Sequence, residues 1–170
     1  MRAVVIFESM FGSTELIARA IAEGLAANTE VVNVDDAPAD FEGVDLLVAG
    51  GPTHVHGMSR PSTRKGALDQ ATDGIRSRRM GLREWLDSLG RANADTYAAV
   101  FDTRLDKPRW LVGSAARGAA ARLRRRGYRM LAKPESFFVD GGTPGELLPG
   151  ELDRAREWAR AIAADSAAKA

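Results

Sequence analysis

The feature that most constrains the fold is the stretch 3–14, where an apolar run passes through a short loop rich in hydroxyl groups into a helical pattern. The first turn of a helix presents unpaired backbone N–H groups and the positive end of the helix dipole, so such a loop can hold a phosphate without a cation. Ser9, Ser13 and Thr14 supply hydroxyl groups, and Gly12 lets the backbone approach the anion. The stretch therefore predicts a strand, a phosphate-binding loop and a helix.

Two common nucleotide-binding motifs are absent from this loop. No lysine follows Gly12, which excludes a G-x-x-x-x-G-K-[ST] loop, and a single glycine excludes G-x-G-x-x-G. The alternative interpretation is an ordinary strand-to-helix turn capped by a Ser or Thr side chain.

Hydrophobic periodicity along the rest of the chain predicts alternating strands and helices. The further strands are expected at 31–34, 44–49 and 97–101, and a fifth strand at 128–131 and 136–139, interrupted at Lys133–Pro134. The helices are expected from Thr14 to about Asn28 and over 81–89, 114–126 and 150–164, with a short one over 62–71. Trp85 lies on the apolar stripe of its helix, so we expect it in the core. This alternation predicts an α/β protein with a doubly wound, five-stranded parallel sheet and helices on both faces.

Length and composition place the chain in the ordinary globular class. Its 170 residues suffice for one domain, 45% of them are apolar and 28% charged, and there is no cysteine. No apolar run approaches the roughly 20 residues of a membrane span, and the chain opens as a strand rather than as a signal peptide. We therefore expect a single cytoplasmic domain over 1–170, with a long insertion or lid at about 54–80.

The ligand site is expected at the carboxyl ends of the strands. In doubly wound sheets, ligands bind there at the point where the strand order reverses, here between the first and third strands. Loops 9–14, 51–58 and 102–110 would meet at that point.

The first two of these loops resemble those of a known superfamily. Ser9, Gly12 and Thr14 match the phosphate loop of the flavodoxin superfamily, and the run S-M-F-G-S-T-E is similar to the version in flavodoxin-like quinone reductases, although Phe11 departs from the short-chain pattern. The run G-P-T-H-V-H-G-M over 51–58 resembles the G-x-P-T-x-x-x-G segment of the same reductases. The resemblance implies the flavodoxin-like strand order 2-1-3-4-5.

The resemblance also implies FMN as the cofactor. The residues expected to bind it come from three loops: Ser9, Met10, Phe11, Gly12, Ser13 and Thr14; Pro52, Thr53, His54, Val55, His56 and Gly57; and Asp102, Thr103, Arg104 and Trp110. Gly57 would permit a peptide rotation when the flavin is reduced. The family normally stacks an aromatic side chain on the flavin, and His54, His56 and Trp110 are the candidates in this chain.

The distribution of charged residues indicates which redox partners the chain would bind. The formal net charge is +1, whereas flavodoxins that shuttle electrons are usually strongly acidic. An arginine cluster over 122–129 is interpreted as a solvated helix face, and a basic segment over 60–79 would favour anionic redox partners or NADPH.

We therefore expect an FMN-binding redox protein that acts in electron transfer or in the NAD(P)H-dependent reduction of a quinone-like acceptor. Its partner would be a small molecule or a redox protein, and no nucleic acid is expected. The alternative is a flavin-free module that binds an acidic partner through its arginines. A zinc site is disfavoured because His54 and His56 are the only histidines and no cysteine is present, and no G-x-S-x-G elbow supports a hydrolase. No metal ligands or catalytic side chains are assigned.

Overall fold

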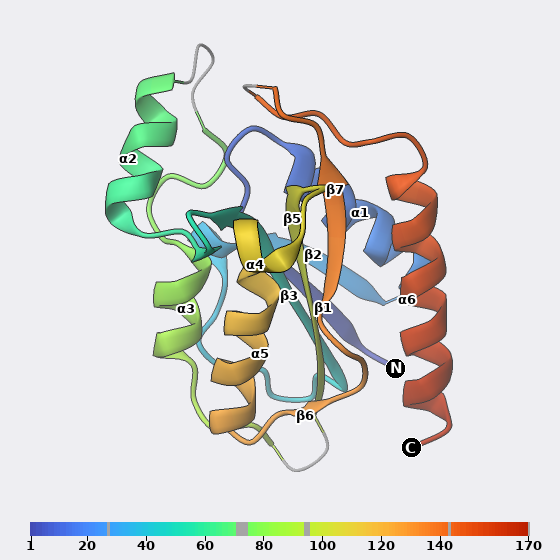
Figure 1. Cartoon of the computed structure of the whole chain (residues 1–170). Coiled ribbons are helices and arrows are strands. Elements are labelled where there is room, and N and C mark those ends of the chain that lie inside the picture. Colours follow the sequence, from blue (N-terminus) through green and yellow to red (C-terminus); the bar gives the residue numbers. More distant parts are fainter. Residues whose placement is uncertain (27, 71–74, 94–95, 143, 170) are drawn as a thin grey trace.

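The computed structural model describes residues 1–26, 28–70, 75–93, 96–142 and 144–169, which form a sheet covered by helices on both faces (Figure 1). The strands are β1 (Ala3–Phe7), β2 (Thr29–Asn33), β3 (Leu46–His54), β4 (Gly57–Met58), β5 (Tyr97–Leu105), β6 (Arg129–Met130) and β7 (Glu135–Val139). The helices are α1 (Ser13–Leu25), α2 (Pro61–Gln70), α3 (Leu82–Ser88), α4 (Arg109–Val112), α5 (Ala115–Arg125) and α6 (Glu151–Ala167), with a 3-10 turn η1 over Val34–Asp36.

The sheet has the predicted topology. The order of hydrogen-bonded strands is β2-β1-β3-β5-β6, and β7 also pairs with β5. All of these pairs are parallel, whereas β4 folds back antiparallel on the end of β3. Because β6 and β7 are two short pieces of one edge, this is the expected order 2-1-3-4-5 with its last strand interrupted.

The interruption of the edge strand lies at Lys133 and Pro134, as predicted. β6 pairs with Tyr97 and Ala98 of β5, and β7 resumes the pairing only from Phe101, so the register skips two residues of β5. Proline has no N–H to donate to a ladder, which explains why the pairing stops there.

Two apolar clusters lie on opposite faces of the sheet. α1 and α6 cover one face and α3 and α5 the other (Figure 1). Trp85 is 1% exposed within the α3 side, as predicted, and its Nε1 donates to Pro38 O at 2.9 Å. Phe101 and Phe137 are fully buried on the α6 side, where their rings meet edge to face.

Several predicted boundaries were wrong, mainly where strands leave the hydrophobic core. β3 continues past Ala49 to His54 and β5 past Phe101 to Leu105, because the two strands stay paired as far as Pro52 and Thr103. Residues 102–104 are therefore strand rather than loop. The short helix α4 was not predicted, α1 ends before Asn28, and α6 continues beyond residue 164. The short helix predicted over 62–71 is α2, although residue 71 lies outside the described residues.

The segment 59–81, which we call the strap, runs from the end of β4 to the start of α3. Glu8, directly after β1, is hydrogen-bonded to both ends of the strap. Its carboxylate accepts hydrogen bonds from the Ser59 hydroxyl and from Leu82 N, the latter at 2.8 Å. That the strap acts as a lid stays a prediction.

The later part of the strap lies along β1 and β2. Arg76 N donates to Met10 O at 3.0 Å and Ser77 N to Ser9 O at 2.9 Å. The Asp35 carboxylate accepts the backbone N–H groups of three consecutive residues, 78–80. Burial alone would raise the pKa of Asp35, but these three donors outweigh it and lower the pKa.

No helix in the described part of the chain is both long enough and apolar enough to cross a bilayer.

Candidate functional site

A cavity of about 140 Å³ lies at the carboxyl ends of β1, β3 and β5. Ten predicted site residues line it: Ser9, Met10, Phe11, Ser13, Thr14, Pro52, Thr53, His54, Thr103 and Arg104. Three further residues in its lining, Leu105, Val139 and Gly145, were not predicted. The three loops therefore do meet at the expected switch point, and the segment after β7 adds a fourth wall.

The loop before α1 has the geometry of an anion cradle. Gly12 stands at the N-cap of α1 with φ of 109°, a left-handed conformation that favours glycine. Ser9 Oγ accepts a hydrogen bond from Gly12 N at 3.1 Å, which holds the loop closed on itself. Among the first N–H groups of α1, that of Glu15 donates to Ser9 Oγ at 3.4 Å, whereas those of Ser13 and Thr14 have no hydrogen-bond partner among the described residues.

The hydroxyl groups of this loop are already engaged. Ser13 Oγ donates to Gly145 O at 2.9 Å, and the hydroxyls of Thr14 and Thr103 are hydrogen-bonded at 2.7 Å. The sequence suggested that these hydroxyls would bind the phosphate directly. In this structure they join the loop to its neighbours, so the backbone N–H groups are the donors that remain for an anion.

Arg76 is a cation at this loop that the sequence did not reveal. Its Nε lies 3.9 Å from the position that a Cβ on Gly12 would occupy and 3.8 Å from a carboxylate oxygen of Glu15. Arg19 holds the other oxygen of Glu15 at 2.8 Å, so that carboxylate already has a partner. The strap thus delivers a 65% exposed guanidinium beside the anion cradle. No local sequence signal could pair residue 76 with residue 12.

The second loop is a tight hairpin. Thr53 pairs with Met58 and His54 with Gly57, so Val55 and His56 form a two-residue turn. Their φ values are 40° and 71°, which is the pattern of a type I′ turn. The positive φ angles therefore fall on Val55 and His56, and not on Gly57, which the resemblance had made the flexible position.

The two histidines of this hairpin differ in their surroundings. His56 is exposed, whereas His54 lines the cavity and is partly buried. Burial lowers the pKa of His54, and the positive charge of Arg64 lowers it further. The surroundings of His54 therefore favour the neutral imidazole over the charged one.

Asp102 turned out to be a structural residue. Its carboxylate Oδ2 accepts hydrogen bonds from Ser114 Oγ at 2.6 Å, Ala116 N at 3.0 Å and Thr53 Oγ1 at 3.2 Å. The side chain is fully buried and faces the start of α5 rather than the cavity. The contact expected at the flavin was with the backbone of Asp102, and it stays a prediction.

Arg104 lines the cavity, as predicted. Its guanidinium donates to Leu105 O at 3.2 Å and to Lys107 O at 2.6 Å, and it lies 5.0 Å from the centre of the Phe138 ring. Burial lowers the pKa of Arg104, but an arginine stays protonated at neutral pH. Its buried Nε has no hydrogen-bond partner among the described residues. The cavity wall thus contains a fixed cation with one donor to spare.

Trp110 is 83% exposed on α4 and does not line the cavity. It is therefore not a buried anchor of the third loop. Gly12, Val55, His56, Gly57 and Asp102 also lie outside the lining.

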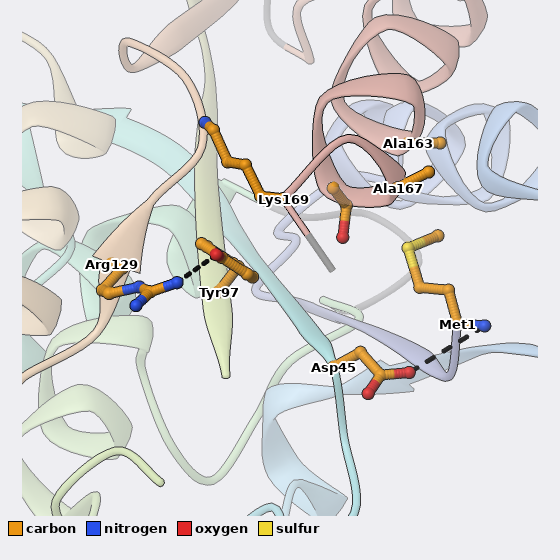
Figure 2. A pocket seen from close by; sticks show the side chains of 8 residues that line it. Met1, Asp45, Tyr97, Arg129, Ala163, Ala167 and Lys169 are labelled. Carbon is orange, nitrogen blue, oxygen red and sulfur yellow. Dashed lines mark hydrogen bonds and ion pairs between the residues drawn. The ribbon is translucent and has the colours of Figure 1, made fainter. Parts of the chain in front are cut away.

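A larger cavity, of about 530 Å³, lies at the opposite edge of the sheet (Figure 2). Its walls include Asp45, Tyr97, Arg129 and Lys169, with Arg129 lying over the Tyr97 ring. These residues stand at the amino ends of the strands or at the end of α6. Ligands of doubly wound sheets bind at the carboxyl ends, so the smaller cavity is the better candidate despite its size.

The fold and the site define a class of protein, namely a doubly wound α/β protein with a glycine-capped strand-to-helix loop at the switch point between β1 and β3. The family model for flavodoxin matches residues 5–86, which contain this loop and the second hairpin. This match and the fold support the flavodoxin-like superfamily, and members of the flavodoxin family bind FMN.

Solved structures agree with this assignment at the level of the fold. A flavodoxin from the domain Archaea is 16% identical, with a TM-score of 0.66 over 98% of this chain and 99% of the other. Flavodoxin 1 from Bacillus cereus is 19% identical, with a TM-score of 0.64 over 100% and 99%. A WrbA-like flavodoxin from Agrobacterium tumefaciens is 17% identical, with a TM-score of 0.56 over 98% of each chain. No curated protein sequence matches the chain.

Proposed function

We propose that this chain binds FMN at the carboxyl edge of its sheet and serves in electron transfer. The observation that carries the proposal is the left-handed Gly12 at the start of α1, placed at the switch point of a flavodoxin-like sheet. The bound flavin would supply the redox chemistry, and the protein would supply binding, orientation and electrostatics.

The phosphate end of FMN fits the residues that are present. The N–H groups at the start of α1 and the helix dipole favour a dianion, and Arg76 adds a positive charge from the strap. Ser9 holds the loop in shape through its bond to Gly12 N. These donors come from two segments, the start of α1 and the strap.

The ring end fits only in part. A cavity of about 140 Å³ is smaller than the roughly 300–1,000 Å³ of typical ligand pockets, so it holds part of a flavin and the rest would lie across its rim. Pro52, His54 and Leu105 offer an uncharged rim, and Arg104 offers a cation that favours negative charge on the ring. The Ser13–Gly145 hydrogen bond closes one side of the cavity, and we expect it to open when the ligand enters.

The direct test is a titration of the flavin-free protein with FMN and with riboflavin, followed by flavin fluorescence and absorbance. The proposal predicts saturable quenching by one FMN per chain and much weaker binding of riboflavin, which lacks the phosphate. No quenching by FMN would refute it and would leave the flavin-free module that binds an acidic partner.

A second candidate is NAD(P)H-dependent reduction of a quinone-like acceptor. Arg104 favours it because a cation in the cavity wall stabilises the reduced, negatively charged flavin. The FMN-loaded protein would then oxidise NADPH in step with the disappearance of an added quinone. If the FMN-loaded protein does not oxidise NADPH with the quinone, this second candidate is excluded, and electron transfer between proteins remains the proposed function.

A further inference from the structure

We propose that the surface beside the cavity docks an acidic electron-transfer protein. This surface, which we call the docking face, consists of the apolar side chains Val55, Trp110 and Leu111 and the cations Arg60, Lys107, Arg109 and Arg117. The proposal rests on the proposed binding of FMN in the neighbouring cavity. The partner would give up one electron per encounter, so that it is oxidised and the bound flavin is reduced.

The first observation is a strained apolar residue at the tip of the second hairpin. Val55 is 80% exposed and has φ of 40°, a conformation that β-branched residues rarely adopt. Such a backbone is strained and persists only where the surroundings impose it, often at functional sites. At this exposure the side chain of Val55 contributes little to the stability of the fold. We infer that this apolar side chain contacts another molecule.

The second observation is that the third loop brings further apolar surface to the same place. Trp110 is 83% and Leu111 49% exposed on the short helix α4. Gly113, at the end of α4, bridges to His56, and a Cβ on Gly113 would lie 2.1 Å from His56 O. This approach requires glycine and fixes α4 against the hairpin. Exposed tryptophan and arginine are enriched at binding hot spots, and Trp110 here directly follows Arg109.

The third observation is the charge around this apolar centre. Residues 55–60 and 105–117, all of which are described, contain four exposed cations and a single exposed carboxylate, Asp106. None of the four cations forms an ion pair with another described residue. The whole chain has a net charge of only +1, so positive charge is concentrated here. An acidic partner would be steered to this face, an effect that raises association rates by about 10- to 1,000-fold.

The position of the face connects docking to the cavity. His54 and Leu105 line the cavity, and each is directly followed by residues of the docking face or its loops. A partner that covers Val55 and Trp110 therefore approaches the rim across which the flavin ring would lie. Nucleic acid is the other polyanion that such a face could attract, and the experiment below distinguishes it from an acidic protein.

The experiment uses the FMN-loaded protein and a reduced, acidic ferredoxin-type protein as the probe, with flavin reduction followed by stopped-flow absorbance. The test variant is Lys107→Glu/Arg109→Glu. The matched control is Lys133→Glu/Arg160→Glu, which makes the same change of charge at exposed residues outside the face. At an ionic strength of about 0.01 M we expect the test variant to slow the reaction at least about tenfold and the control less than about twofold. The difference should vanish near 1 M salt.

Equal slowing of both variants, or no slowing of either, would overturn the proposal. So would a labelled oligonucleotide that competes with the ferredoxin and loses affinity in the test variant alone. Trp110→Ala should slow the reaction at high salt as well, because its contribution is apolar, and it should leave FMN affinity unchanged. Binding of the same ferredoxin to the flavin-free chain, measured by biolayer interferometry, keeps a failure of docking distinct from a failure to bind FMN.

Discussion

At the scale of single residues, the phosphate end of the site depends on a side chain that is distant in sequence. Arg76 lies beside Gly12 because residues 76 and 77 are hydrogen-bonded to the backbone of the phosphate loop. Its nearest carboxylate, Glu15, is held closely by Arg19. Arg76 shares this carboxylate with Arg19, at the longer distance of 3.8 Å, and its exposed side chain leaves room for a ligand beside it.

Arg76→Gln should weaken FMN binding by about tenfold, which is the worth of roughly 1.4 kcal/mol, and leave riboflavin binding unchanged. The effect should shrink as salt is added, because the guanidinium is exposed. Isothermal titration calorimetry with both flavins measures it. Arg19→Gln is the control, since Arg19 contacts the same glutamate on the exposed side of α1. An equal loss in both variants would assign the effect to Glu15 and not to the phosphate.

Arg104 acts at the other end of the cavity. Arg104→Gln should make the midpoint potential of bound FMN more negative, by about 1 kcal/mol per electron at an effective dielectric near 20 after screening. Arg109→Gln, which removes an exposed cation nearby, should change the potential much less. Spectroelectrochemical titration of the two variants gives the comparison. Equal potentials for wild type and Arg104→Gln would show that the guanidinium does not act on the ring.

At the scale of elements, the second hairpin combines a regular ladder with an irregular turn. A type I′ turn needs positive φ at both central residues and favours Asn-Gly, whereas this chain has Val55 and His56. Val55→Asn/His56→Gly should raise the free energy of unfolding by about 1–2 kcal/mol, since it relieves the strain at two positions. Urea denaturation followed by circular dichroism measures the gain. Val55→Thr keeps the branched Cβ and should show none; a gain there would mean that strain is not the cause.

Glu8 provides a pH-dependent element, because it joins β1 to both ends of the strap. Burial raises the pKa of Glu8, although hydrogen bonds from Ser59 and Leu82 and the charge of Arg64 oppose the shift. The folded protein therefore holds this proton more tightly than the unfolded chain does. Stability consequently falls as the pH rises from the unfolded pKa of about 4.3 to the higher folded pKa, and is then constant.

Glu8→Gln should remove this decrease in stability with rising pH. The amide can accept from Leu82 N and donate to Ser59 Oγ, so it preserves both connections without a titrating group. Denaturant titrations between about pH 4 and pH 7 should show the variant gaining stability relative to wild type as the pH increases. Parallel curves for the two proteins would contradict the raised pKa. Glu15→Gln, at an exposed ion pair, is the control.

The limits of sequence reasoning also appear at this scale. The burial of Trp85 and the break at Pro134 follow from local patterns, the order of strands follows from the resemblance to the flavodoxin superfamily, and the structure confirms all three. The ends of β3 and β5 were missed because their last residues, such as Thr53 and Arg104, are polar and stay in the sheet through long-range pairing.

The residues of the candidate site also fall into two groups, those that a local sequence motif predicts and those that only long-range pairing brings to the cavity. Eight of its lining residues lie on the two segments that resemble the flavodoxin superfamily, 9–14 and 51–58. Val139 and Gly145 carry no motif, and they reach the cavity only because β7 pairs with β5 and the following segment turns back. Arg76 belongs to this second group. The position of Arg76 depends on backbone hydrogen bonds between the strap and the loop 9–14. A hydrophobic pattern in the sequence cannot predict such long-range bonds.

At the scale of the whole molecule, ligand binding and stability are linked. A ligand that binds only the folded state at about 100 times its dissociation constant adds roughly 2.7 kcal/mol. For a chain of this size that corresponds to a rise in melting temperature of about 5–10 °C. Differential scanning fluorimetry with FMN should show this shift. Riboflavin at the same concentration should give a clearly smaller one, and identical shifts would argue against a phosphate site.

The broken edge of the sheet affects how the protein behaves among its own copies. A continuous, unpaired outer strand can template the addition of a strand from another molecule, which leads to polymers. Here that edge offers only the two-residue β6 and the start of β7, whose end is already paired with residues 146–148. Exposed Lys133 and a proline that has no donor separate the two pieces. An incoming strand would find neither a continuous row of hydrogen-bonding groups nor a neutral surface. The interruption that looks like a defect in the fifth strand therefore protects a crowded solution of this protein from fibre growth along its sheet.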